Sequence, residues 1–283
     1  MKIYFSPLCL SYGYPGHPES PERIRVVHEY LKRKDYSFVE PQPCSKEDVL
    51  RVHSEEMVSS VKAGTFFDWD TPVLPNIYDL ALLSAGSAIQ SLDSALNGET
   101  AFSLMRPPGH HAMKQRVMGF CYFNNIAVAA AKYLEENLEK RIAILDIDCH
   151  HGNGTEDIFL GNESVLYVSI HQSPLYPGTG LESKQNALNF LLPPGTGEEE
   201  YLKTMQIACE KIEEYNPSIL CISVGFDTFA EDPLTHLNLK IASYGKIGKT
   251  IAGMKKPTFI VMEGGYSPKL PECVHAFVRG LDG

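Results

Sequence analysis

Long apolar runs that alternate with amphipathic segments are the feature that most constrains the fold of this chain. Runs of this length and composition are typical of strands that are buried on both faces. Four of them are predicted as buried strands, at residues 141–148, 164–171, 218–227 and 256–266. Helical patterns lie between them, at residues 124–137 and 198–216. Strands that alternate with helices predict a mainly parallel sheet with helices on both faces.

The first third of the chain is predicted to be more helical than the rest. Residues 45–64 place Ser45 and Asp48 at capping-box spacing and end at a glycine, which predicts a helix. A second helix is predicted over residues 78–98, which end in Asn-Gly. The chain contains no internal repeat, low-complexity tract or linker-like stretch. Residues 1–283 are therefore interpreted as a single three-layer α/β domain.

Charge and cysteine usage narrow the classes of function. The net charge of −10 argues against direct nucleic-acid binding, and no apolar run is long enough to span a membrane. The seven cysteines are scattered and form no CxxC pair, which argues against a disulfide framework or a thiolate zinc site. Since the N-terminus also lacks a signal-peptide pattern, a cytoplasmic protein is expected.

Four polar clusters follow apolar runs at the points where the runs end, and three of these runs are predicted strands. In parallel sheets, ligands bind outside the carboxyl ends of the strands, so these clusters are expected to meet at one edge of the sheet. They are RPPGHH at 106–111, after a short apolar run at 100–105, DIDCHH at 146–151, VGFDTF at 224–229 and MEGGY at 262–266.

The second and third clusters contain the residue types of a metal site. Residues two apart on an extended chain point the same way, so Asp146, Asp148 and His150 share one face. Asp148, His150 and Asp227 are interpreted as ligands, because carboxylates and imidazole suit zinc, iron or manganese. Three protein ligands leave a coordination position open, which is typical of a catalytic site. The alternative is a set of helix caps in strand–helix turns.

The first and fourth clusters supply groups that can move protons or stabilise charge. His110 and His111 are adjacent and point in different directions, and a neutral imidazole is the usual proton acceptor near a metal-bound water. Tyr266 follows two glycines, and its phenol can donate a hydrogen bond to a developing oxyanion. The alternatives are structural histidines and a core tyrosine.

Six longer motifs stand in order along the chain: RPPGHHA, GFCYFNN, DIDCHHGNGT, PLYPGTG, GFDTFAEDPL and EGGY. In this order they resemble the zinc-dependent histone deacetylases and acetylpolyamine amidohydrolases of the arginase-deacetylase superfamily. The likeness runs from PGHPESPERI near the N-terminus to Tyr266. It implies the arginase-deacetylase fold and the hydrolysis of N-acetylated amines to acetate and a free amine by a metal-activated water.

The resemblance implies a role for each residue of the site. Three residues match the zinc ligands, with iron(II) as an alternative ion: Asp148, His150 and Asp227. His110 and His111 match the paired histidines of the family, and Tyr266 matches the tyrosine that polarises the carbonyl. Asp146 matches a buried acid that orients His110 and helps to bind a structural potassium ion. The other potassium ligands implied are the Ser169 side chain, the Ile170 carbonyl and the main-chain carbonyls of Asp148 and His150.

The resemblance also implies the residues that contact the substrate. They are Gly119, Phe120, Tyr176, Leu234 and Asp70. Phe120 and Tyr176 match the aromatic walls of the acyl-lysine tunnel, and Asp70 matches an acid at its rim. Leu234 stands where dedicated eukaryotic polyamine deacetylases have a glutamate, so this route to polyamine selectivity is absent. Acetyl-lysine, longer acyl-lysines and acetylpolyamines are all retained as candidate substrates.

Several alternatives stay open at this level. Asn153 stands where some members have an acid, so His111 is expected to stay neutral and the chain to lie near the class II and bacterial branch. A two-manganese, arginase-like enzyme would leave Tyr266 without a role. An inactive acyl-lysine-binding module is the alternative of another class, although no ligand is lost. Cys149 is expected to face away from the metal. A monomer and a homodimer are expected equally, since no long insertion follows Phe67.

Overall fold

The four predicted strands form in the structure, a computed structural model that describes residues 1–283, and every residue in them is buried. They are β4 (Ile142–Asp146), β5 (Val165–Gln172), β7 (Ile219–Val224) and β8 (Thr258–Met262). In β4, Ile142 and Ile144 join one apolar cluster, whereas Ala143 and Leu145 join another on the opposite face. Because both faces are covered, most positions of each strand are apolar.

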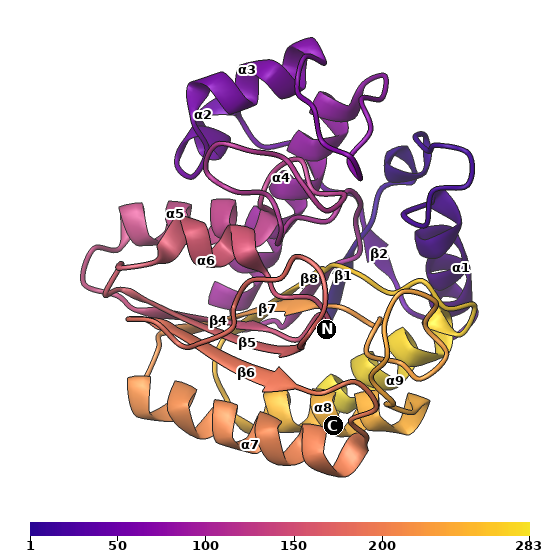
Figure 1. Cartoon of the computed structure of the whole chain (residues 1–283), viewed down its shortest axis with the longest axis vertical. Coiled ribbons are helices and arrows are strands. Elements are labelled where there is room, and N and C mark those ends of the chain that lie inside the picture. Colours follow the sequence, from indigo (N-terminus) through magenta and orange to yellow (C-terminus); the bar gives the residue numbers. More distant parts are fainter.

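A sheet of eight parallel strands runs through the molecule in the order β2-β1-β3-β8-β7-β4-β5-β6 (Figure 1). The remaining strands are β1 (Lys2–Tyr4), β2 (Phe38–Val39), β3 (Ala101–Ser103) and β6 (Ala187–Leu192). The sequence analysis missed β1, β2 and β6, which are short or partly exposed. Since β3, β8, β7 and β4 are successive neighbours, the carboxyl ends that precede the four polar clusters lie side by side.

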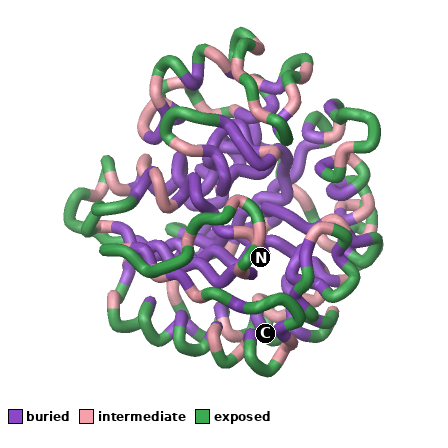
Figure 2. Tube along the Cα trace, viewed as in Figure 1, coloured by how far each residue is buried: buried purple, intermediate pink, exposed green.

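Helices cover both faces of the sheet, so the predicted three-layer α/β fold is confirmed (Figure 1). On one face lie α4 (Ile77–Leu96), α5 (Asn125–Glu136) and α6 (Asn153–Phe159). On the other lie α7 (Glu198–Tyr215), α8 (Ile241–Gly253) and α9 (Leu270–Asp282), with α1 (Pro21–Lys32) against α9 and a 3-10 turn, η1 (Pro7–Leu10), beside α1. Figure 2 shows the buried strands between layers whose outer faces are exposed. None of the helices combines the length and the apolar character that a membrane span requires.

The single helix predicted over residues 45–64 is wrong, because two helices form there. They are α2 (Lys46–Leu50) and α3 (Glu55–Ala63). The capping box predicted at Ser45 and Asp48 is present. The chain leaves the helical path at His53, whose buried imidazole bonds to backbone groups 60 and 71 residues away. Ser54 then starts α3, since its side chain caps the new helix.

Candidate active site

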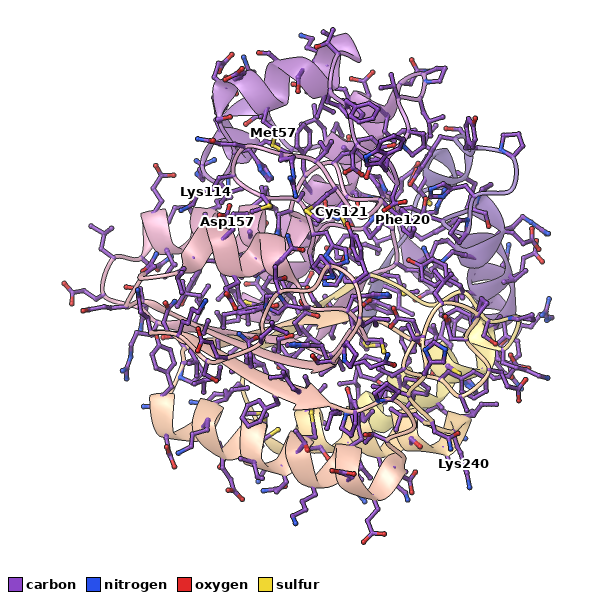
Figure 3. All side chains as sticks on the ribbon, viewed as in Figure 1. Met57, Lys114, Phe120, Cys121, Asp157 and Lys240 are labelled. Carbon is purple, nitrogen blue, oxygen red and sulfur yellow. The ribbon has the colours of Figure 1, made fainter.

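The four polar clusters meet beyond the neighbouring ends of β3, β8, β7 and β4, and three of them line a cavity of about 220 Å³. The remaining cluster, at residues 224–229, reaches the site through Asp227, which contacts His150. Five residues of these clusters with a predicted role line the cavity: His110, His111, Asp148, His150 and Tyr266. All five positions expected to contact substrate line it as well: Asp70, Gly119, Phe120, Tyr176 and Leu234. Four further lining residues were not anticipated: Pro108, Cys121, Leu175 and Gly264. Figure 3 labels Phe120 and Cys121 in the middle of the molecule, between the sheet and the layer of α2 and α3.

Asp148, His150 and Asp227 bring one donor atom each within 4.8 Å of one another. His150 Nδ1 lies 3.0 Å from Asp148 Oδ1 and 2.9 Å from Asp227 Oδ2. Asp227 Oδ2 is nevertheless buried without a hydrogen bond, which is costly for a carboxylate oxygen. Burial, and then the charge of Asp148, raise the pKa of Asp227 to about 7. Two carboxylates and an imidazole thus crowd into one buried site, and a divalent cation fits this donor set.

Backbone N–H groups hold the two carboxylates in place. Gly264 N donates to Asp148 Oδ2 at 2.8 Å, and Cys149 N donates to Asp227 Oδ1 at 2.9 Å. A Cβ on Gly264 would lie 2.6 Å from Oδ2 of both Asp148 and Asp227, so only glycine permits this close approach. The Cys149 side chain belongs to the apolar cluster on the α7–α9 face, and burial raises the pKa of its thiol well above the usual range. Cys149 thus points into the core.

The two adjacent histidines have different partners. His110 Nδ1 lies 3.0 Å from Asp146 Oδ2, and His111 Nδ1 lies 2.7 Å from Asn153 Oδ1. Burial alone would lower the pKa of His110, but Asp146 and nearby carboxylates raise it to about 10. Burial and the neighbouring imidazoles lower the pKa of His111 well below its usual range. A neutral His111 donates its Nδ1–H to Asn153, which leaves Nε2 as a proton acceptor.

Tyr266 is held at its backbone and at its ring. Its N–H donates to Asp232 Oδ2 at 2.7 Å, and the guanidinium of Arg23 lies 4.5 Å from the centre of its ring. Asp232 Oδ1 accepts from Leu234 N at 3.0 Å, so one carboxylate positions two walls of the cavity. Burial raises the pKa of Tyr266 well above its usual range, and the phenol therefore keeps its proton.

A buried charged network behind Tyr266 was not predicted from the sequence. Arg23 donates to two backbone carbonyls after β8, each at 2.7 Å, and pairs with Glu19, which also binds Arg106. The Glu263 side chain accepts from the His110 N–H at 3.2 Å and from the preceding N–H at 2.7 Å, so it fixes the backbone of the histidine pair. These charged residues occur inside the motifs PESPERI, RPP and EGGY. Their position within these motifs is the signal that could have indicated a buried role for them.

The residues expected to bind potassium lie behind the histidine pair. Asp146 and Ser169 are register partners on the neighbouring strands β4 and β5, and both are fully buried. Ile170, the next residue of β5, is fully buried as well. In this structure Ser169 Oγ lies 2.9 Å from His171 Nδ1.

Comparison with known proteins places these observations in a family. The histone deacetylase domain family matches residues 17–281. A protein named "Probable deacetylase" from Archaeoglobus fulgidus is 39% identical over 278 residues, covering 89% of this chain and 77% of that protein. A "Histone deacetylase-like amidohydrolase" from Pseudomonas aeruginosa is 36% identical over 294 residues, covering 95% and 77%. The crystal structure of an acetylpolyamine aminohydrolase from Burkholderia pseudomallei superposes with a TM-score of 0.93 at 26% identity, covering 100% of this chain and 99% of that one. The resemblance inferred from the six motifs is thereby confirmed.

Proposed function

Since the chain belongs to the histone deacetylase family and is a hydrolase of amide bonds, we propose that it is a zinc-dependent deacetylase of N-acetylated amines. The proposal is carried by the cluster of Asp148, His150 and Asp227 at the cavity, where Asp227 Oδ2 is buried without a hydrogen bond. The substrates would be acetyl-lysine side chains or acetylpolyamines, and the products acetate and the free amine.

Asp148, His150 and Asp227 would bind zinc, or iron(II), which the same donors accept. Such an ion supplies Lewis-acid polarisation of the acyl oxygen and lowers the pKa of a bound water. A structural potassium ion would be held by Asp146, Ser169, the Ile170 carbonyl and the main-chain carbonyls of Asp148 and His150. The positive charge of this ion would balance the buried charge of Asp146.

His111 would move the protons of the reaction. Its Nε2 accepts a proton from water as the water oxygen bonds to the acyl carbon, and Asn153 keeps that nitrogen free by accepting from Nδ1–H. The Tyr266 phenol donates a hydrogen bond to the oxygen that gains charge. The C–N bond then breaks, and the proton held by His111 passes to the leaving nitrogen. His110, paired with Asp146, would orient the charges around this centre.

The cavity wall would orient the acyl group and exclude bulk water. Phe120 and Tyr176 face the histidines and the tyrosine, since the ring of Phe120 lies 6.1 Å from that of Tyr266 and the ring of Tyr176 lies 5.3 Å from that of His111. Gly119, Leu234 and Asp70 would complete the substrate contacts. The Asp70 carboxylate at the rim would accept a hydrogen bond from the substrate.

The test is acetate release by the zinc-loaded protein from N-acetylputrescine and from an acetyl-lysine peptide at equal concentration. Turnover of either substrate supports the proposal, and the ratio assigns the substrate. A butyryl-lysine peptide serves as the third substrate. Zinc bound at one equivalent without turnover of any of the three would refute it and would favour an inactive binding module.

A matched pair of variants tests the metal site. His150→Ala should lose bound zinc, measured by elemental analysis, because one of three donors is removed. The exposed histidine variant His236→Ala should retain zinc and activity. Unchanged zinc content in His150→Ala would remove that residue from the ligand set.

A further inference from the structure

The tandem histidines of the DIDCHH motif leave one residue without a role. His150 is a proposed ligand, but the His151 side chain does not line the cavity. It is only 2% exposed, so both of its ring nitrogens need partners inside the protein. The Nδ1 atom lies 2.8 Å from Thr179 Oγ1, and the Nε2 atom lies 3.1 Å from Glu156 Oε2.

Thr179 belongs to the segment that follows β5, residues 173–182, which we term the Tyr176 loop. At the next position, Gly180, an added Cβ would lie 2.4 Å from the His151 ring, so the loop backbone is pressed against the imidazole. The hydrogen bond and this close contact fix one point of the loop, three residues after Tyr176.

Glu156 connects His151 to a second point of the same loop. Its Oε2 atom also accepts from Asn189 Nδ2 at 2.8 Å, and the same amide donates to the Glu182 carbonyl at 3.0 Å. Glu156 lies on α6. The first turn of this helix is bonded to the histidine pair, because Gly154 N donates to the His110 carbonyl at a distance of 3.0 Å. The loop is therefore tied to the same helix as the proposed proton acceptor.

Leu175, which is partly buried, is the one residue of this loop that packs against the main apolar core. Tyr176 is 38% exposed and Leu181 is 63% exposed, and Gly178 is exposed as well. A loop with so little buried apolar area depends on its few polar anchors for a defined position. The Tyr176 ring nevertheless lies 5.3 Å from the His111 ring and 6.3 Å from the His150 ring, so its position decides how wide the cavity is beside them.

We propose that His151 is a positioning residue that, through Thr179 and Glu156, holds the Tyr176 loop and so sets which acyl groups the cavity accepts. The inference rests on the proposed function. Thr179 Oγ1 is the partner of the buried Nδ1 atom of His151, so removal of that hydroxyl leaves a buried ring nitrogen unpaired. The loop then samples more positions and closes less well on a small acyl group.

The experiment uses Thr179→Val, which keeps the shape of the side chain and removes the hydroxyl. Thr179→Ser retains the hydroxyl and should behave as the wild type. Thr250→Val is the matched control, since Thr250 bonds a backbone carbonyl within α8. Hydrogen–deuterium exchange of residues 173–182 should become roughly threefold to tenfold faster in Thr179→Val alone, the effect of one lost hydrogen bond. Thermal unfolding of each variant shows whether the whole fold is affected.

Kinetics of the zinc-loaded enzyme supply the second readout. In Thr179→Val, the KM for an acetyl-lysine peptide should rise roughly threefold to tenfold, while kcat stays within about twofold. The preference for acetyl over butyryl peptides should fall, and Thr179→Ser should restore it. An equal loss of kcat for both peptides would overturn the inference.

The exchange measurement separates this inference from the proposed function. Unchanged loop exchange in Thr179→Val overturns the role of His151, whether or not the enzyme deacetylates. If wild type hydrolyses no substrate, the proposed function fails, while faster loop exchange in Thr179→Val alone still supports the anchoring of the loop.

Discussion

Acidification should destabilise the protein through His53, and the size of the effect follows from its contacts. His53 Nδ1 donates to the Met113 carbonyl at 2.8 Å, and Nε2 accepts from Asn124 N at 2.9 Å. The imidazole is only 3% exposed. A proton on Nε2 would meet the Asn124 N–H, so the neutral form is required here. Burial lowers the pKa of His53 to about 4, although the bond to the Met113 carbonyl opposes this shift.

The sign follows from comparing this pKa with that of the unfolded chain, which is about 6.5 for histidine. Because the folded pKa is the lower one, protons bind preferentially to the unfolded chain, and stability is lost as the pH falls from about 6.5 to about 4. Linkage gives a loss of about 2 kcal/mol between pH 7 and pH 5 from His53 alone.

The assay is urea unfolding of metal-free protein at pH 7 and pH 5, followed by circular dichroism, for wild type and His53→Gln. The variant loses hydrogen bonds at both pH values, but its free energy of unfolding should depend less on pH, by about 2 kcal/mol over this interval. Other titrating groups contribute to both proteins and cancel in the comparison. An identical pH dependence in the two proteins would refute the assignment of a depressed pKa to His53.

Two further predictions concern the site. Tyr266→Phe should lower kcat by roughly a hundredfold to a thousandfold with zinc content unchanged, because one donor to the developing charge is lost; turnover and elemental analysis check this, with the exposed Tyr14→Phe as a control that should change neither. Gly264→Ala should weaken zinc binding in a competition assay with a chelator, since the new Cβ would displace the carboxylates it meets at 2.6 Å, whereas Gly253→Ala, which meets nothing within 4 Å, should bind zinc as tightly as wild type.

The main strands could be predicted because burial on both faces requires long runs of mostly apolar residues, which are visible in the sequence. The runs that became β4, β5, β7 and β8 are apolar at almost every position. β2 has only two residues, and β6, at the end of the sheet, alternates buried and partly exposed positions. Neither strand therefore has a long apolar run. The break between α2 and α3 depends on contacts of His53 with distant backbone groups, which helical periodicity does not report.

The placement of the polar clusters could be predicted for a similar reason. Each cluster follows a strand, and parallel strands bring their carboxyl ends together whatever their order in the sequence. The network behind Tyr266 differs, because Glu19 and Arg106 are 87 residues apart and the strand before Arg106 does not specify its partner. Only the tertiary structure shows which of these charged residues pair, although each charge that is buried in apolar surroundings needs a partner.

The alternation that builds the sheet also builds the proposed metal site. Within β4 the odd-numbered residues face the α7–α9 layer, and beyond the end of the strand Ile147 and Cys149 continue in the same apolar cluster. The positions between them carry Asp146, Asp148 and His150, which thereby point to the opposite side, toward the histidine pair and the cavity. Inserting one residue before Asp146 would exchange the two sets and direct two carboxylates into an apolar core, at a cost of several kcal/mol each. The spacing of these ligands is thus constrained by folding as strictly as by chemistry.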